Sequence, residues 1–148
     1  MPDPVLSVEI SVFCHATEEL DKVKQAILRI LPEDLRSIYE GKLNVNMLEG
    51  YYGNPVFSLK LRIDERTHAS TVVKWMLEHL NLDDIQMLSN ELEKRLDSSG
   101  NLYLRFDKQY AFLGKIKIYE GDDVIKVKVK FSQQARRGIL EKGLKAIR

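Results

Sequence analysis

Residues 57–63 of the chain read FSLKLRI, in which every second side chain is apolar. The apolar positions are 57, 59, 61 and 63, and the positions between them are polar or cationic. Successive side chains of a β-strand point to opposite faces, so this period of two puts one face in a core and the other in water. The stretch therefore predicts a strand in a sheet that is covered on one side only.

The same alternation recurs in five other segments, residues 6–15, 43–47, 101–106, 115–119 and 124–131. The short run EGDD separates the last two segments, which predicts that they form a hairpin. Adjacent strands joined by short turns favour a mainly antiparallel sheet.

Three segments repeat apolar residues at the spacing of an amphipathic helix, approximately residues 17–31, 67–80 and 83–96. Thr17 is the expected N-cap of the first, and Pro32 ends it. The expected order is β-α-β-β-α-α-β-β-β. Since the strand pattern leaves one sheet face open, we expect the three helices on the other face. The fold class is therefore α+β, a two-layer sandwich of a mainly antiparallel sheet and three helices packed on one face.

The chain of 148 residues contains no repeat or linker that would divide it. We expect one α+β domain over residues 1–131 and a basic C-terminal tail, helical or frayed, over residues 132–148. Apolar residues of the tail could form a short helix that docks on the domain. Its cations could grip phosphates or only keep the C-terminus solvated.

The net charge of +1 conceals a strong asymmetry along the chain. Residues 1–107 contain 12 Lys and Arg against 18 Asp and Glu, whereas residues 108–148 contain 11 against 4. The two parts therefore carry −6 and +7. A basic segment at one end indicates an anionic partner.

The alternation also places most strand cations on the predicted open face. Glu9 is the only acid among these strand positions, and Phe13 and Tyr103 offer aromatic surface beside the cations. Such a face is typical of modules that hold unpaired RNA. Lysines on exposed strands also serve solvation and protect sheet edges, so this alternative stays open. The expected cations are Lys60, Arg62, Arg105, Lys115, Lys117, Lys126, Lys128 and Lys130.

The sequence offers no pattern that indicates catalysis, a metal site or a cofactor. It has one cysteine and three histidines, too few for a structural zinc site, and no Gly-rich phosphate loop. We therefore expect a protein that is not an enzyme. The absence of a signal segment and of about 18 consecutive apolar residues favours the cytoplasm and no membrane partner.

Three motifs carry a resemblance to a known family: SVFCHATE at residues 11–18, LEGYYGNP at 48–55 and NLYLRFDKQ at 101–109. Over residues 6–131 the chain resembles an archaeal family of small predicted RNA-binding proteins, often described as a predicted exosome subunit. The family pattern often has histidine where this chain has Tyr51. The resemblance implies a fold similar to the large-subunit ribosomal protein that carries 5S RNA.

The combined hypothesis is an RNA-binding-like domain without catalytic chemistry, acting as an accessory protein near the RNA-degrading exosome. Tyr51 and Tyr52 could stack on bases or cover the sheet edge, and Arg105 could instead pair with Asp107. The alternative function is a docking subunit of an RNA-processing complex that uses the same lysine-rich face. The candidate RNA-binding residues are Lys60, Arg62, Arg105, Lys108, Lys126, Lys128, Lys130, Tyr51, Tyr52 and Tyr103.

Overall fold

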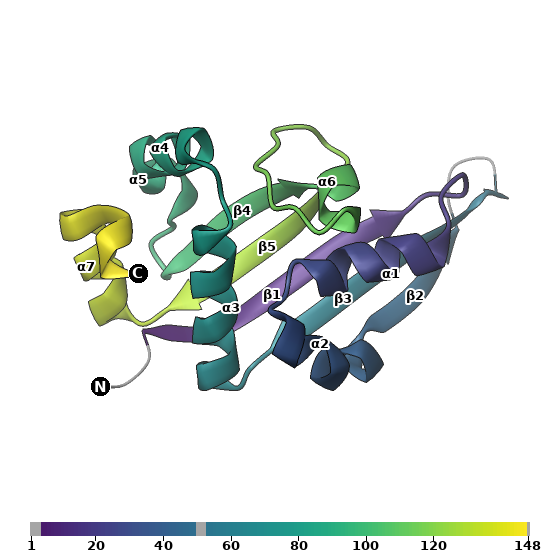
Figure 1. The fold of residues 1–148 in the computed structure, drawn as a ribbon, viewed down its shortest axis with the longest axis horizontal. Helices are drawn as coiled ribbons and strands as arrows, with labels where there is room; N and C mark the ends of the chain where they lie inside the picture. Colours follow the sequence, from purple (N-terminus) through teal and green to yellow (C-terminus); the bar gives the residue numbers. More distant parts are fainter. Residues whose placement is uncertain (1–3, 50–52, 148) are drawn as a thin grey trace.

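The computed structural model describes residues 4–49 and 53–147, and its sheet and helices form two layers (Figure 1). Five strands make one sheet in the order β2-β3-β1-β5-β4, and every neighbouring pair is antiparallel. This confirms the α+β class and the antiparallel sheet. The strands are β1 (Val5–Cys14), β2 (Asn44–Glu49), β3 (Pro55–Ile63), β4 (Asn101–Asp107) and β5 (Val124–Phe131).

The expected count of three helices is wrong, because the described residues form seven α-helices and two short 3₁₀ helices. Residues 32–42 hold a helix and a 3₁₀ turn, and the predicted helix 83–96 is divided at Glu91. The α-helices are α1 (Leu20–Arg29), α2 (Glu33–Tyr39), α3 (Arg66–Glu78), α4 (Leu82–Asn90), α5 (Leu92–Arg95), α6 (Lys108–Phe112) and α7 (Gln133–Lys142); the 3₁₀ helices are η1 (Glu40–Lys42) and η3 (Gly143–Ala146).

The predicted strand 115–119 is also wrong, and with it the hairpin and the strand order. Ile116 and Ile118 are buried, which explains the alternation, but only Ile118 forms a bridge, to Phe106. The segment runs beside the β4 edge, where Lys117 O accepts a hydrogen bond from Asp107 N–H. β5 pairs with β1 and β4 instead, since a central strand must satisfy both of its edges.

The hydrophobic core lies between the sheet and the helices. Figure 1 shows α1 and α3 crossing in front of the strands, and α3 packs against β1. Val8, Ile10 and Val12 of β1 are buried, as are Leu59 and Leu61 of β3. Burying each such side chain contributes about 1.5–3 kcal/mol, so the alternating apolar row fixes which face of each strand meets the helices.

Residues after β5 are helical. Ser132 caps α7 by accepting a hydrogen bond from Ala135 N–H at 3.1 Å. Ile139, Leu144 and Ile147 are buried and belong to the same core cluster as the sheet. Among the described helices, none is long and apolar enough to cross a membrane.

Gly100 gives a direct test of the turn that leads into β4. It has φ +89°, and a Cβ there would lie 2.6 Å from Phe131 O, which is backbone. We expect Gly100→Ala to lower the free energy of unfolding by at least about 2 kcal/mol, measured by urea denaturation.

Gly41→Ala is the matched control, because a Cβ at Gly41 meets nothing within 4 Å and its φ is not positive. This variant should be neutral or slightly stabilising. Equal effects of the two substitutions would contradict the described turn.

Candidate nucleic-acid interface

The open face of the sheet is organised by the strand register into cross-strand rows. One row runs Tyr103, Lys128, Glu9 and Arg62 across β4, β5, β1 and β3. Directly opposed side chains on neighbouring strands lie close enough to interact. The charged and aromatic residues that the sequence spreads from Glu9 to Lys128 therefore become neighbours. The next row along the strands runs Arg105, Lys126, Ser11, Lys60 and Asn44.

Six of the eight expected cations lie on these strands, whereas Lys115 and Lys117 lie in the segment beside β4. Glu9 holds the centre of the face: its Oε2 is 3.6 Å from Arg62 Nη1 and 3.8 Å from Lys128 Nζ. Arg62 Nε also donates a hydrogen bond to Asp64 at 2.8 Å. This hydrogen bond, with the charge of Asp64, raises the pKa of Arg62, so its positive charge is permanent.

Lys60, Lys126 and Lys130 are exposed, and in the part of the chain that the structure describes no carboxylate lies within 4.0 Å of their ammonium groups. Lys60 and Lys126 share one row with Arg105. Like charges on neighbouring strands repel one another. A bound polyanion would relieve this repulsion.

Arg105 has a buried Nε with no hydrogen-bond partner among residues 4–49 and 53–147. The ion pair with Asp107 that the sequence left open is not present between these described residues. Asp107 ends β4 and caps α6 instead, accepting a hydrogen bond from Tyr110 N–H at 3.0 Å. A buried N–H group without an acceptor costs free energy.

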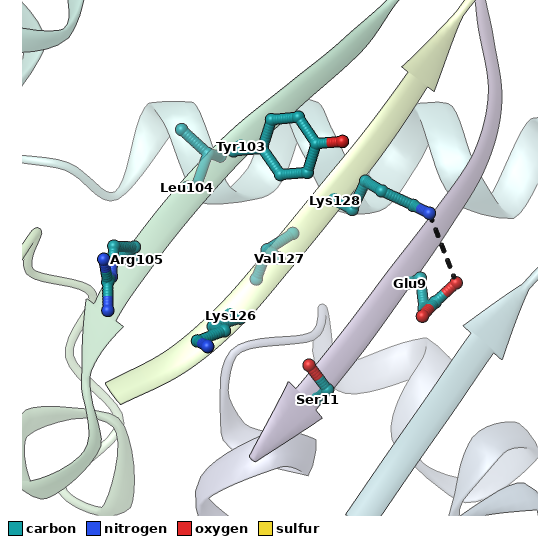
Figure 2. Close-up of a pocket in the computed structure, with 8 residues that line it drawn as sticks. All are labelled: Glu9, Ser11, Tyr103, Leu104, Arg105, Lys126, Val127 and Lys128. Atoms are coloured by element: carbon teal, nitrogen blue, oxygen red, sulfur yellow. Dashed lines mark ion pairs between the residues drawn. The ribbon is translucent and has the colours of Figure 1, made fainter. Parts of the chain in front are cut away.

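A shallow hollow of about 390 Å³ opens on this face above β4, β5 and β1 (Figure 2). Figure 2 shows the face with the helices behind the sheet, Tyr103 and Lys128 near one end of the hollow, and Arg105 and Lys126 near the other. Its volume lies at the lower end of the range for small-ligand sites. The hollow is lined by Glu9, Ser11, Tyr103, Leu104, Arg105, Lys126, Val127 and Lys128.

Tyr103 is an anchored aromatic platform at the edge of the hollow. Its hydroxyl donates a hydrogen bond to Asp97 Oδ2 at 3.0 Å, and its side chain is exposed. Backbone N–H groups of Asn101 and Ser99 donate to Asp97 Oδ1, and these bonds lower the pKa of Asp97. The hydrogen bond to Asp97 raises the pKa of Tyr103, so the phenol stays neutral and its ring stays in place at pH 7.

Lys108 is buried, unlike the other described candidates for RNA contact. Its Nζ donates hydrogen bonds to Phe13 O at 2.8 Å, to Glu18 Oε1 at 2.9 Å and to Asp123 Oδ1 at 2.6 Å. These bonds tie α6 to the end of β1, to the turn before α1 and to the segment before β5. Lys108 therefore belongs to an internal ion pair with Glu18 and Asp123, and its contact with a phosphate stays a prediction.

The same cluster contains the one group of possible metal ligands found among the described residues. Ligand atoms of His15, Glu18 and Asp123 lie within 4.8 Å of one another. The Lys108 ammonium already supplies the positive charge between the two carboxylates. Burial raises the pKa of Asp123, but the hydrogen bond and charge of Lys108 outweigh it, and the pKa is lowered. The cluster fits an internal ion pair better than a metal site.

Tyr51 and Tyr52 lie outside the described residues, so their predicted contacts stay predictions.

A family model described as RNA binding matches residues 7–131, which is most of the chain. The chain belongs to this RNA-binding family. An archaeal relative named RNA-binding protein PAB1135, from Pyrococcus abyssi, is 35% identical over 124 residues and covers 84% of this chain and 80% of the relative. The family resemblance is therefore confirmed, while the exosome association and the ribosomal-protein fold stay predictions.

Solved structures of similar proteins share the fold over nearly the whole chain. A crystal structure of a DUF54 protein from Archaeoglobus fulgidus has a TM-score of 0.79 and 28% identity, covering 96% of this chain and 99% of that one. Another from Sulfolobus solfataricus has a TM-score of 0.77 and 32% identity, covering 95% and 96%. The RNA-binding family thus has the same arrangement of sheet and helices in separate members.

The sequence did not predict two features of the structure. The anchoring of Tyr103 by Asp97 was not foreseen, although Asp followed by Ser-Ser-Gly is a recognisable turn in which an Asp side chain accepts backbone N–H groups. The buried state of Lys108 had no local signal, because its partners lie 90 and 15 residues away.

Removing the buried ammonium tests the structural role of Lys108. We expect Lys108→Met to lower the free energy of unfolding by about 2 kcal/mol, because the charge-assisted hydrogen bonds to Glu18 and Asp123 are lost. Urea denaturation measures this change, with Lys74→Met on the exposed side of α3 as control.

The difference in the free energy of unfolding between Lys108→Met and the wild type should shrink at acid pH. The pKa of Asp123 is lowered in the folded protein. The stability that its ionised carboxylate contributes is therefore fully present above the ordinary carboxyl pKa, and it is lost as the pH falls through the lower pKa of the folded state. Unchanged stability together with weakened RNA binding would restore Lys108 as an RNA contact.

Proposed function

We propose that this chain is a non-catalytic RNA-binding protein that holds RNA on the open face of its sheet. The observation that carries the proposal is the concentration of six cations on one face of a domain that belongs to an RNA-binding family. The relative from Pyrococcus abyssi, named an RNA-binding protein, supports the same partner.

The phosphates would lie along β5 and its neighbours. Lys126 and Lys130 are exposed and separated by Lys128 on the same face, so the three side chains leave the backbone at every second residue, about 7 Å apart. This spacing resembles that of successive phosphates in an extended strand. Lys60, Arg62 and Arg105 widen the positive surface to both sides.

The bases would use the aromatic surface. Tyr103 on β4 and Phe13 on β1 are exposed on the same face as the cations, with 44% and 46% of their surface accessible. Base stacking on such rings contributes about 1–3 kcal/mol per base and needs unpaired nucleotides. Single-stranded RNA is therefore the proposed ligand.

Association with the exosome is supported by the family resemblance, and the cytoplasm as the place of action is supported by the sequence, which has no run of about 18 consecutive apolar residues. The absence of catalysis is proposed from the sequence, which offers no pattern of residues that indicates a catalytic site.

A second candidate function uses the same surface. The lysine-rich face could dock an acidic protein of an RNA-processing complex, favoured by the three lysines that lack acidic neighbours among the described residues. Partners recovered in a pull-down after nuclease treatment would support this alternative, and partners lost after nuclease treatment would support bridging by RNA.

The lysines without ion-pair partners provide the first test. We expect Lys126→Gln with Lys130→Gln to weaken binding of single-stranded RNA and to reduce the slope of log K against log salt by about 1.4, at about 0.7 per lost phosphate contact. Fluorescence anisotropy at several salt concentrations measures both quantities.

Lys74→Gln with Lys94→Gln is the matched control, because it removes the same charge from exposed positions of α3 and α5. Equal losses in the two double variants would show that only net charge matters and would exclude the open face as the binding surface.

Tyr103 provides the second test. We expect Tyr103→Leu to weaken RNA binding by about tenfold through lost stacking while leaving the salt slope unchanged. Tyr103→Phe should stay close to wild type in affinity, since the ring remains and only the bond to Asp97 is lost. Equal affinity of the leucine variant and wild type would contradict stacking on this ring.

A further inference from the structure

Glu9 is a carboxylate at the centre of the cationic face and the only one that lines the hollow. Arg62 and Lys128 approach its Oε2 at 3.6 and 3.8 Å, beyond the length of a hydrogen bond. Within residues 4–49 and 53–147, no group donates a hydrogen bond to this carboxylate, although its side chain is only 32% exposed. Both oxygens are therefore available to accept hydrogen bonds from a ligand.

Lys128 stands between Glu9 and Tyr103 in one cross-strand row. Neighbouring strands are about 4.8 Å apart, so Glu9 and Tyr103 have backbones about 10 Å apart. Figure 2 shows the Lys128 ammonium directed at Glu9, with the Tyr103 ring on the other side of Lys128. A base on the Tyr103 ring could turn its edge toward the Lys128–Glu9 pair.

This pair presents a donor followed by two acceptors: the ammonium of Lys128 and then the two carboxylate oxygens of Glu9. The Watson–Crick edge of guanine is complementary, because it has an acceptor at O6 followed by donors at N1 and N2. Adenine and cytosine each have a single amino donor on this edge, and uracil has one N–H between two acceptors. Guanine is the one standard base that satisfies both oxygens of the carboxylate.

We infer that the hollow between Tyr103 and Glu9 is a nucleobase site that selects guanine in single-stranded RNA. Tyr103 supplies the stacking surface, Glu9 accepts from N1–H and N2–H, and Lys128 donates to O6. The Arg105 guanidinium and the Lys126 ammonium, at the other end of the hollow, are placed for the adjoining phosphate. This inference rests on the proposed function and adds base selectivity to it.

The test compares short oligouridines that carry one central guanine, inosine, adenine or cytosine. Fluorescence anisotropy with the full chain should give affinity for guanine on the order of tenfold above adenine and cytosine, as expected of one bidentate contact. Inosine should be intermediate, because its base keeps O6 and N1–H but lacks the N2 amine.

Glu9→Gln should abolish the preference for guanine, because the amide replaces one acceptor by a donor while keeping the shape of the side chain. Asp64→Asn is the matched control: it makes the same change of charge beside the same Arg62 but lies outside the hollow. Both variants should bind oligouridine slightly more tightly than wild type, and only the first should lose selectivity. Circular dichroism checks that both are folded.

Different results would contradict the guanine site and the RNA-binding function. Salt-sensitive binding of all four RNAs without a preference for guanine in the wild type would overturn the base site and leave the proposed function standing. A preference for guanine that survives Glu9→Gln would also overturn it. Failure to bind any of the RNAs would overturn the proposed function and the base site together.

Discussion

The open face exists because β1, the middle strand of five, keeps a two-residue period from Val8 to Cys14 while it pairs with both β3 and β5. Ile10 meets the helices and is fully buried, so Glu9 and Ser11 must point the other way. A register slip of one residue would bury Glu9 and expose Ile10, and the core therefore enforces the position of the polar row. Because Lys126 and Lys128 pair with Ser11 and Glu9 of β1, their side chains lie on the same open face.

The arrangement has a physical cost that a ligand would offset. Arg105 and Lys126 carry like charges at directly opposed positions of β4 and β5, and the buried Nε of Arg105 has no acceptor among the described residues. Places where a structure departs from full satisfaction of its polar groups are often functional sites. Glu9 moderates the repulsion at the centre of the face. Asp97 holds Tyr103, so the platform is formed before any partner arrives.

Local patterns predict those parts of the molecule that local physics controls. The alternation in residues 57–63 and 124–131 predicted both strands and which of their side chains face outward. The same rule failed at Ile116 and Ile118, since burial beside a sheet edge also alternates without strand pairing. The short helices α2 and α6 give too few turns for a clear periodic signal. Strand order and the burial of Lys108 depend on partners distant in sequence, which no local pattern encodes.

The central claim is that RNA lies on the open sheet face and not on the helical layer. The most direct measurement is an amide nitrogen–proton NMR titration of the labelled chain with a short single-stranded RNA. We predict saturable shifts at Glu9, Ser11, Tyr103, Lys126 and Lys128 of the three adjacent strands, with α3 and α4 unchanged. Saturable shifts confined to the helices, while these strand residues stay unchanged, would contradict the account.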